Sequence, residues 1–357
     1  MNKLFLLFLT MTLISSCQNS ENTNENKNAT IAKFSIVIHG GAGGIERSNF
    51  TEAQETAYKQ QLEISLNAGY KILEDGGSAI NAVQAAIVIL EDSPLFNAGK
   101  GAVFNSEGLQ EMDASIMNGY TLNTGAVAGI NHVKNPILAA NKVLDSSKHV
   151  LLSGKGAEIL VKKYGIQMVP SSYFYTDKRF QQLQKILGKN KISKDHSALL
   201  QVQPLIDDHK YGTVGAVAYD KSGSIAAGTS TGGMTNKKYG RIGDSPIIGA
   251  GTYANNTTCG ISSTGTGEYF IRTVAAHEVS SILKYTKSSP KKALQEVIFN
   301  QIAPLGGKGG MILIDKNASV FWDFNTKGMF RGYKKSTGET VIELFEKTAY
   351  PKNKIIK

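Results

Sequence analysis

Residues 212–230, GTVGAVAYDKSGSIAAGTS, are the stretch of sequence that decides the fold. Two runs in which bulky and small residues alternate, Thr213–Tyr219 and Ser224–Ser230, flank the short segment Asp220-Lys221-Ser222-Gly223. Alternating runs joined by a short loop that contains glycine are typical of a β-hairpin. The stretch therefore predicts two neighbouring antiparallel strands.

Strands and helices are expected on both sides of this hairpin. Apolar alternation predicts strands at Ser35–Ile38, Ala114–Met117, Ala126–Ile130, Gly310–Ile314, Ser319–Phe324 and Met329–Tyr333. Helical spacing predicts helices from Thr51 to Gly76 and at Ala79–Glu91, Pro136–Leu144, Ala157–Tyr164, Glu268–Tyr285 and Pro290–Gln301. Hairpins separated by pairs of helices indicate antiparallel sheets covered by helices, an α/β class of fold. The polar stretch from Pro170 to Lys210 is expected to be a poorly ordered loop.

The composition is that of a globular protein. Of the 357 residues, 41% are hydrophobic and 19% are charged, which provides ample material for a core. The 37 glycines show no collagen period. A surplus of 39 basic over 29 acidic residues gives a net charge of +10, but no run interleaves basic and aromatic residues. We therefore expect no nucleic-acid partner.

The N-terminal segment has the pattern of an export signal. A short positive start, Met1-Asn2-Lys3, precedes the apolar run Leu4–Ile14, and Ile14-Ser15-Ser16-Cys17 resembles a bacterial lipobox. The pattern predicts a signal peptide at 1–16, then a lipidated Cys17 and a flexible tether at 17–33. An exported lipoprotein is expected, periplasmic or membrane-anchored, that contacts a membrane only through its lipid anchor. An ordinary cleaved signal is the alternative.

Thr213 has the position that an N-terminal nucleophile would need. It stands after Gly212, where a loop enters the first strand of the hairpin. A threonine hydroxyl is a weak nucleophile and requires a base. If the peptide bond before Thr213 were cut, the new α-amino group, with a pKa of about 7.7–8.0, would be that base. By itself, however, Gly-Thr-Val before a strand is ordinary β sequence.

Several longer motifs make the assignment specific. HGGAGG at 39–44, SPLFNAGKGAVFN at 93–105, MDASIMNG at 112–119, TSTGGMTNKKYGRIGDSPIIGAGTYA at 229–254 and STGTGE at 263–268 resemble the plant-type asparaginase/isoaspartyl peptidase family of N-terminal nucleophile hydrolases. The likeness runs from about residue 34 to residue 335. It implies an αββα sandwich, two antiparallel sheets between helical layers, as a single domain at 34–357. It also implies self-cleavage between Gly212 and Thr213 into an α chain of residues 18–212 and a β chain of residues 213–357. The resemblance further implies a dimer of αβ units and catalysis without a cofactor.

The resemblance also implies roles for individual residues. Thr213 would attack the substrate, Thr231 would bond its hydroxyl and Asn97 would hold its α-amino group. The Thr264 hydroxyl and the Gly265 amide would stabilise the oxyanion. In the substrate-binding loops, Arg241 would bind the α-carboxylate, Asp244 would bind the α-ammonium, and the neighbouring positions would be Ile242, Gly243, Thr266 and Gly267.

A structural sodium ion and the substrate class follow from the resemblance as well. Backbone carbonyls would hold the ion in the loop from Leu90 to Lys100, through Leu90, Glu91, Ser93, Phe96, Ala98 and Lys100, and Lys100 departs from the family pattern there. The expected substrates are L-asparagine and β-aspartyl dipeptides, from which L-aspartate is released. The loops at 232–237 and 264–267 favour this activity over the alternative, a glycosylasparaginase acting on N4-(β-N-acetylglucosaminyl)-L-asparagine. An inactive binding lipoprotein with the same fold is the non-enzyme alternative.

Overall fold

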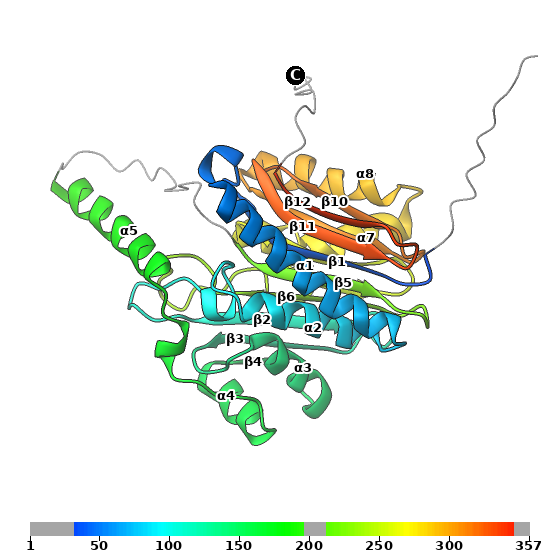
Figure 1. The fold of residues 1–357 in the computed structure, drawn as a ribbon, viewed down its shortest axis with the longest axis horizontal. Coiled ribbons are helices and arrows are strands. Elements are labelled where there is room, and N and C mark those ends of the chain that lie inside the picture. The colour runs from blue at the N-terminus through cyan, green and yellow to red at the C-terminus, as the bar shows by residue number, and fades with distance from the viewer. Residues whose placement is uncertain (1–31, 196–211, 346–357) are drawn as a thin grey trace, which may run out of the picture. The chain divides into compact units, whose positions relative to one another are not determined.

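The computed structural model describes residues 32–195 and 212–345, which belong to one compact unit (Figure 1). The predicted signal peptide, Cys17 and most of the tether lie outside the described residues. Among the described residues, no helix combines the length and the apolar character needed to cross a membrane.

The larger of the two sheets has eight strands in the order β12-β11-β1-β5-β6-β2-β3-β4. These are β1 (Ser35–Gly43), β2 (Met112–Asn118), β3 (Thr124–Ile130), β4 (Leu151–Ser153), β5 (Val214–Tyr219), β6 (Ile225–Thr231), β11 (Gly328–Lys335) and β12 (Thr340–Phe345). The predicted hairpin is β5–β6, in which Val214 pairs with Ser230 and Tyr219 pairs with Ile225. Its turn is closed at Gly223, whose φ of +84° suits glycine.

The smaller sheet has four strands in the order β10-β9-β8-β7. They are β7 (Thr252–Asn255), β8 (Cys259–Gly265), β9 (Gly309–Asp315) and β10 (Val320–Phe324). The two sheets face each other across a shared apolar layer, to which Val37 and Val217 contribute from the larger sheet and Ile312 from the smaller one.

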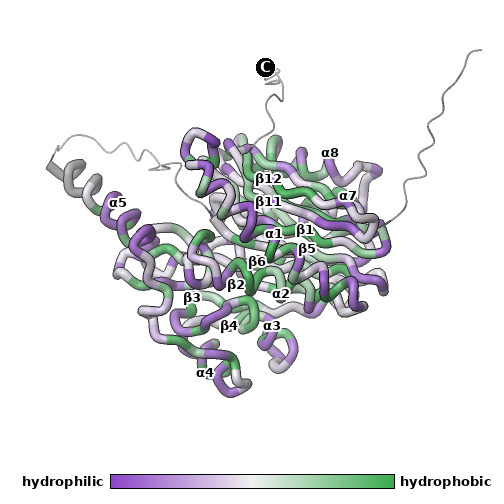
Figure 2. The backbone as a smooth tube through the Cα atoms, in the orientation of Figure 1, coloured by the Kyte–Doolittle hydropathy of each residue, from purple (hydrophilic) through white to green (hydrophobic). Residues whose placement is uncertain are grey.

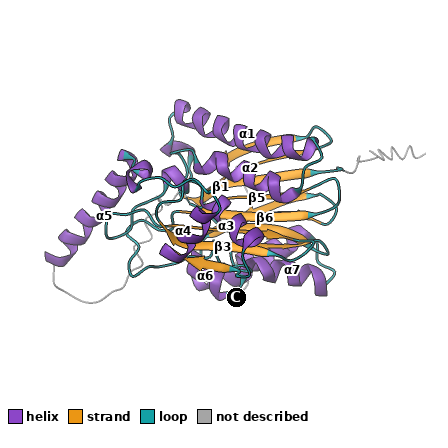
Figure 3. Cartoon of the chain, turned by 90° about the horizontal axis from the view of Figure 1, so that it is seen from below, coloured by secondary structure: helices purple, strands orange, loops and turns teal. Residues whose placement is uncertain are grey.

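Helices cover the outer face of each sheet, so the order of layers is αββα (Figure 3). The larger sheet is covered by α1 (Glu52–Glu74), α2 (Ala79–Glu91) and α3 (Pro136–Ser146), with α4 (Gly154–Lys163) against β3. The smaller sheet is covered by α7 (Ala275–Tyr285) and α8 (Pro290–Gln295). The core under α1 and α2 includes Leu66 and Ile87, and the core under α7 and α8 includes Val279 and Leu294. The predicted αββα sandwich is confirmed.

Local sequence explains where the first two helices begin. Thr51 and Gln54 form a capping box at α1, with Gln54 N donating to Thr51 Oγ1 and Thr51 N donating to Gln54 Oε1. Ser78 caps α2 by accepting a hydrogen bond from Asn81 N. Helix α2 begins and ends at the predicted residues.

The expectation of a loop from Pro170 to Lys210 is wrong for its described part. A 3₁₀ turn at Ser171–Phe174 leads into helix α5 (Asp177–Asp195), and the remainder, 196–211, lies outside the described residues. Helix α5 is mostly hydrophilic in Figure 2, whereas the central strands β5 and β6 are largely hydrophobic. The sequence of α5 is polar, but one side of the helix is buried near its start, at Arg179 and Leu183.

The long helix expected at Glu268–Tyr285 is in fact two helices. Helix α6 (Gly267–Arg272) ends before Val274, which has a φ of +48°, and α7 follows. The first amides of α7 find external partners, since Ala276 N and His277 N donate to Ala250 O and Gly249 O. These bonds stabilise a break that helical spacing alone does not reveal.

Three other departures concern shorter segments. The helix expected at Pro290–Gln301 continues past α8 as a π-helix, Glu296–Ile302, and ends in a 3₁₀ turn, Ala303–Leu305. Strand β4 pairs with β3 in parallel, an exception to the antiparallel expectation. Two more 3₁₀ turns, Arg47–Asn49 and Gly99–Gly101, lie in the connections after β1 and α2.

Candidate functional site

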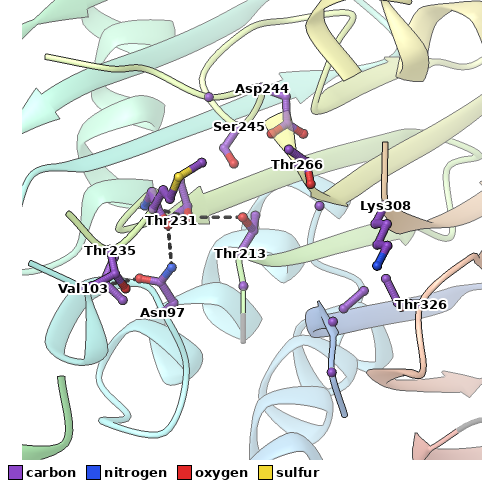
Figure 4. A pocket seen from close by; sticks show the side chains of 18 of the residues that line it. Asn97, Val103, Thr213, Thr231, Thr235, Asp244, Ser245, Thr266, Lys308 and Thr326 are labelled. Carbon is purple, nitrogen blue, oxygen red and sulfur yellow. Dashed lines mark hydrogen bonds between the residues drawn. The ribbon is translucent and has the colours of Figure 1, made fainter. Parts of the chain in front are cut away.

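A pocket lies where the ends of β5, β6 and β8 meet the loops that follow β1, α2 and β6 (Figure 4). Thr213 stands in it, directly before β5, and is 6% exposed. The same pocket is lined by Asn97, Thr231, Arg241, Asp244, Gly265 and Thr266. Residues from four separate segments of the sequence therefore meet at one place.

The Thr213 hydroxyl donates to Thr231 Oγ1 over 3.1 Å. Thr231 Oγ1 also accepts from Gly233 N over 3.0 Å, and Gly233 O accepts from Asn97 Nδ2 over 2.8 Å. Asn97 is in turn held by Val103 N, which donates to its Oδ1 over 3.0 Å. Asn97 thus reaches Thr213 through Thr231 and the Gly233 backbone, as Figure 4 shows, and both ends of its amide are engaged in the uncut chain.

The peptide unit before Thr213 is closely packed. A Cβ on Gly41, whose φ is +111°, would lie 2.6 Å from Gly212 N and 2.7 Å from Gly212 O. On the other side, a Cβ on Gly212 would lie 3.0 Å from Thr264 Oγ1. The Thr264 hydroxyl, which accepts from Ala42 N over 3.4 Å, therefore lies beside the bond between Gly212 and Thr213.

Arg241 is held by a residue to which the sequence reading gave no role. Its Nε and Nη2 donate to the two carboxylate oxygens of Glu268, each over 2.8 Å. Burial lowers the pKa of the Arg241 guanidinium, but the ion pair with Glu268 outweighs this and raises it. A bidentate pair fixes the plane of a guanidinium, so Glu268 sets the direction in which the remaining N–H groups of Arg241 point.

Asp244 is fully buried beside Arg241, and burial raises the pKa of its carboxyl to about 7. Its Oδ2 accepts no hydrogen bond within the described part of the chain. A Cβ on Gly267 would lie 2.8 Å from Asp244 Oδ1, so glycine is required there for the close approach. A buried carboxylate oxygen without a donor, on the wall of a pocket, suits a ligand that brings its own N–H groups.

Of the remaining predicted positions, Gly243, Gly265 and Thr266 line the pocket and Ile242 does not. Gly265 has a φ of +156° and a Cβ there would lie 2.4 Å from Lys308 O, which accepts from Thr266 N over 2.9 Å. Gly243 lies against Arg241, since a Cβ there would be 2.8 Å from Nη1. Ile242 is 41% exposed and does not line the pocket.

Several residues of the pocket were not anticipated. Arg179 and Gln182 come from α5, in the stretch expected to be a loop, and Lys308 and Thr326 come from the segments around β9 and β11. Arg179 Nε donates to Gly101 O over 2.7 Å, which ties α5 to the loop that carries Asn97. No local motif marks these residues, because they reach the pocket only through the tertiary fold.

In the loop from Leu90 to Lys100, where a sodium ion was predicted, two backbone carbonyl oxygens lie close to glycines. A Cβ on Gly99 would lie 2.3 Å from Glu91 O, and one on Gly101 would lie 2.0 Å from Phe96 O. Any side chain at either position would therefore clash with a carbonyl oxygen, so both positions require glycine. Leu90 O and Ala98 O already accept backbone amides. The Lys100 ammonium lies 4.9 Å from the centre of the Tyr173 ring. Within residues 32–195 and 212–345, no group of three His, Cys, Asp or Glu side chains could hold a metal ion.

The Glu91 side chain forms buried hydrogen bonds that do not involve its backbone carbonyl. Burial raises the pKa of the Glu91 carboxyl to about 8, and its Oε1 accepts from Ser230 Oγ over 2.6 Å and from Ile137 N over 2.9 Å. Ser230 is the serine of the segment Gly228-Thr229-Ser230-Thr231-Gly232, which matches the G-x-S-x-G pattern of esterases. The Ser230 hydroxyl is buried and donates to Glu91, so the match to the esterase pattern does not mark a nucleophile here.

Comparison with known proteins agrees with this site. Residues 32–343 match the Asparaginase family. The chain is 46% identical to an isoaspartyl peptidase of Salmonella typhimurium, over 87% of this chain and 98% of that protein. It is 40% identical to a probable isoaspartyl peptidase/L-asparaginase 2 of Arabidopsis thaliana, over 88% and 99% of the two chains. An isoaspartyl peptidase/L-asparaginase of Xenopus laevis is 37% identical over 82% and 90%.

The predicted localisation as an exported bacterial lipoprotein, periplasmic or membrane-anchored, is wrong. Relatives from Salmonella typhimurium, Escherichia coli, Arabidopsis thaliana and Xenopus laevis are named isoaspartyl peptidases or isoaspartyl peptidase/L-asparaginases, and none of these names describes a lipoprotein. The expectation depended on residues 1–17 alone, which lie outside both the family match and the described residues.

The fold, the site and the comparisons lead to one family. The αββα sandwich places Thr213 at the start of a central strand, beside Thr231 and across the pocket from Asp244. The family match covers most of the chain, and the relatives align over nearly their whole length. The chain therefore belongs to the asparaginase family of N-terminal nucleophile amidohydrolases.

Proposed function

We propose that this protein cuts itself between Gly212 and Thr213 and then hydrolyses β-aspartyl dipeptides and L-asparagine, releasing L-aspartate. The observation that carries the proposal is the hydrogen bond from the Thr213 hydroxyl to Thr231, at the wall of a pocket that also contains Arg241 and Asp244. The relatives' names, isoaspartyl peptidase and isoaspartyl peptidase/L-asparaginase, support this choice of substrates.

Self-cleavage would begin at the packed Gly212–Thr213 unit. Attack of Thr213 Oγ1 on the Gly212 carbonyl carbon moves the acyl group from nitrogen to oxygen, and water then hydrolyses the ester. The products are a Gly212 carboxylate and a β chain, residues 213–357, that begins with a free α-amino group. That amino group is the base that the Thr213 hydroxyl otherwise lacks.

The pocket provides groups for both ends of an aspartyl substrate. Asp244 Oδ2 would accept hydrogen bonds from the substrate α-ammonium, and the Arg241 N–H groups not used by Glu268 would bind the α-carboxylate. The substrate side-chain carbonyl would then lie at Thr213. The Thr264 hydroxyl and the Gly265 amide would stabilise the oxyanion.

The reaction itself has two halves. Thr213 Oγ1 attacks the side-chain carbonyl while its α-amino group accepts the proton, and the tetrahedral intermediate collapses to an ester as ammonia or a peptide amine leaves with that proton. Water then attacks the ester, which releases aspartate and restores Thr213. Thr231 and Asn97 would hold the nucleophile during both halves.

The sodium ion and the dimer stay predictions. If sodium binds, the carbonyls of Glu91 and Phe96 would be among its ligands, and the ion would stiffen the loop that carries Asn97. The ion would be structural, with no part in the chemical steps.

A substrate panel tests the proposed function. Purified protein is incubated with L-asparagine, a β-aspartyl dipeptide, the matched α-aspartyl dipeptide and N4-(β-N-acetylglucosaminyl)-L-asparagine, and free aspartate is measured. We expect aspartate from the first two and none from the α-linked dipeptide, with Thr213→Ala inactive on all four. Preferential hydrolysis of the glycosylated substrate would instead support a glycosylasparaginase. Inactivity of the wild-type chain on every substrate would favour a binding protein.

A further inference from the structure

A buried chain of polar side chains behind Thr213 has no part in the mechanism above. His39 Nδ1 lies 3.1 Å from the carbonyl oxygen of Thr213, and His39 Nε2 lies 2.8 Å from Ser262 Oγ. Ser262 Oγ lies 2.6 Å from Thr229 Oγ1, and Thr252 Oγ1 donates to Thr229 Oγ1 over 2.5 Å. All four side chains are fully buried between the two sheets.

The far end of this chain touches the substrate loop. Ser115 Oγ lies 2.8 Å from Thr252 Oγ1 and 2.6 Å from the carbonyl oxygen of Ser245, the residue after Asp244. The polar chain therefore connects the backbone of the nucleophile to the backbone next to the ammonium site, through the interior of the sandwich.

The chemistry of the groups fixes the direction of the hydrogen bonds. A carbonyl oxygen can only accept, so His39 Nδ1 must carry a proton in order to bond Thr213 O. Burial lowers the pKa of His39 to about 3, so the ring is neutral and Nε2 carries no proton. Nε2 must then accept from Ser262, which leaves Ser262 to accept from Thr229 and Thr229 to accept from Thr252. The donors from Thr252 to His39 therefore point toward Thr213, whereas Ser115 donates away from it, to Ser245 O, and Gly251 O lies 3.2 Å from the Thr229 hydroxyl as a second acceptor.

The bond between His39 and Ser262 needs a glycine at position 215. Gly215, two residues after Thr213, pairs with His39 across β5 and β1. A Cβ on Gly215 would lie 2.0 Å from Ser262 Oγ and 2.5 Å from His39 Nε2. Any side chain at this position would therefore displace the bond between His39 and Ser262, although Gly215 has no need of a left-handed conformation.

We infer that His39 is a positioning residue for the nucleophile: its Nδ1–H holds the Thr213 carbonyl, and the Ser262–Thr229–Thr252 hydroxyls hold the imidazole in that orientation. The inference rests on the proposed function, in which Thr213 attacks. His39 acts on the backbone of Thr213 from behind, so the hydroxyl and the α-amino group stay free to face the pocket. Because small displacements of a nucleophile reduce the rate strongly, loss of the bond between His39 and Thr213 should lower kcat.

Two substitutions of His39 separate the two ring nitrogens. The amide nitrogen of His39→Asn can occupy the place of Nδ1 and donate to Thr213 O, whereas the longer His39→Gln places its amide near Nε2 and loses that bond. We expect His39→Asn to keep kcat within about threefold of wild type, since it retains a neutral hydrogen bond. His39→Gln should lower kcat by about tenfold to a hundredfold with KM unchanged, when rates are divided by the amount of free Thr213 N-terminus and folding is checked by thermal unfolding.

Ser262→Ala provides a second, independent test, because it removes the donor to Nε2 and leaves both His39 and Thr213 in place. Its kcat should fall, and its effect should be largely contained in that of His39→Gln when the two are combined. Equal kcat losses in His39→Asn and His39→Gln, or full kcat in both, would overturn the inference. So would a loss of unfolding temperature with no change in kcat per free N-terminus.

Nitrogen-15 NMR of histidine-labelled Thr213→Ala protein tests the arrangement without any activity. The spectrum should show one neutral imidazole protonated at Nδ1 that stays neutral down to pH 4. An Nε2-protonated or charged His39 would overturn the inference even if the proposed function holds. Conversely, a wild-type chain that neither cuts itself nor hydrolyses substrate would disprove the proposed function, whatever the His39 tautomer.

Discussion

Glu268 holds Arg241 by two parallel hydrogen bonds, each 2.8 Å long, from Nε and Nη2 to its two carboxylate oxygens. The pair links the loop after β6 to the start of α6, so the residue assigned to the substrate carboxylate is oriented by a residue from another motif. Gly243 leaves room for the guanidinium, because a Cβ there would lie 2.8 Å from Arg241 Nη1. If Arg241 binds the substrate carboxylate as proposed, Glu268 orients it for that role, although Glu268 itself carries the wrong charge to bind a carboxylate.

Glu268→Gln should raise KM for L-asparagine by about three- to tenfold and leave kcat nearly unchanged. The glutamine can still accept one hydrogen bond, but it loses the charge that fixes the guanidinium, and a charge-assisted bond is the stronger of the two. Steady-state kinetics measure the effect, and Glu278→Gln on the exterior helix α7 is the control. A fall in kcat at constant KM would show instead that Glu268 acts on the chemical step.

Thr231→Val should lower kcat by about tenfold to a hundredfold with little change in KM, because it removes the oxygen that accepts from Thr213 Oγ1. It should also slow self-cleavage, which uses the same hydroxyl. Thr258→Val is a matched control, since Thr258 is equally buried and its hydroxyl lies 2.6 Å from Ser280 Oγ, far from the pocket. If both variants lowered kcat alike, Thr231 would have no special relation to the nucleophile.

Gly41→Ala should block or strongly slow the cut between Gly212 and Thr213. The new Cβ would lie 2.6 Å from Gly212 N, and that neighbour is backbone, which cannot move aside like a flexible side chain. Gly108→Ala is the control, because its φ of +78° is also positive but nothing lies within 4 Å. Electrophoresis over time should show Gly108→Ala cut at the wild-type rate, while Gly41→Ala persists as one chain. Equal rates would mean that packing at Gly41 is irrelevant to cleavage.

Asp244→Asn should stabilise the uncut chain at high pH. Burial raises the pKa of Asp244 from 3.8 to about 7, so between these values the folded chain keeps a proton that the unfolded chain releases. The free energy of unfolding of the wild type therefore falls as the pH rises through this window. The asparagine side chain of the variant does not titrate, so the variant does not lose stability in this way. In a Thr213→Ala background, we expect Asp244→Asn to be more stable by about 2–4 kcal/mol at pH 8. The difference should vanish near pH 4, and a difference independent of pH would contradict the account.

The sequence predicted best what depends on neighbours along the chain. The hairpin β5–β6 and the helix α2 follow from their apolar patterns, and both appear within a residue or so of the expected bounds. Strand β8 was not predicted, because Ser262, Ser263 and Thr264 are all polar and leave no apolar alternation after Ile261. Ser262 and Thr264 lie beside the candidate site, so the strand signal of β8 is weak where its side chains serve that site.

For the candidate site too, the sequence indicated residues within motifs but not contacts between distant segments. Arg241 and Asp244 were indicated by the motif at 229–254, and Thr213 by its place before the first hairpin strand together with the resemblance. His39 and Glu268 also lie inside quoted motifs, at 39–44 and 263–268, but their partners Thr213 and Arg241 are 174 and 27 positions away, so no local pattern revealed these contacts. Helix α5 was missed for a related reason, since its sequence is mostly polar and its buried side chains, Arg179 and Leu183, do not form an apolar stripe.

The most direct test of the central claim is the mass and N-terminal sequence of the purified wild-type protein, compared with Thr213→Ala. We expect a wild-type fragment of residues 213–357 that begins Thr-Val-Gly-Ala, and a single uncut chain for Thr213→Ala. A wild-type chain that remains whole after long incubation, or that is cut at another bond, would contradict the assignment of Thr213 as an N-terminal nucleophile.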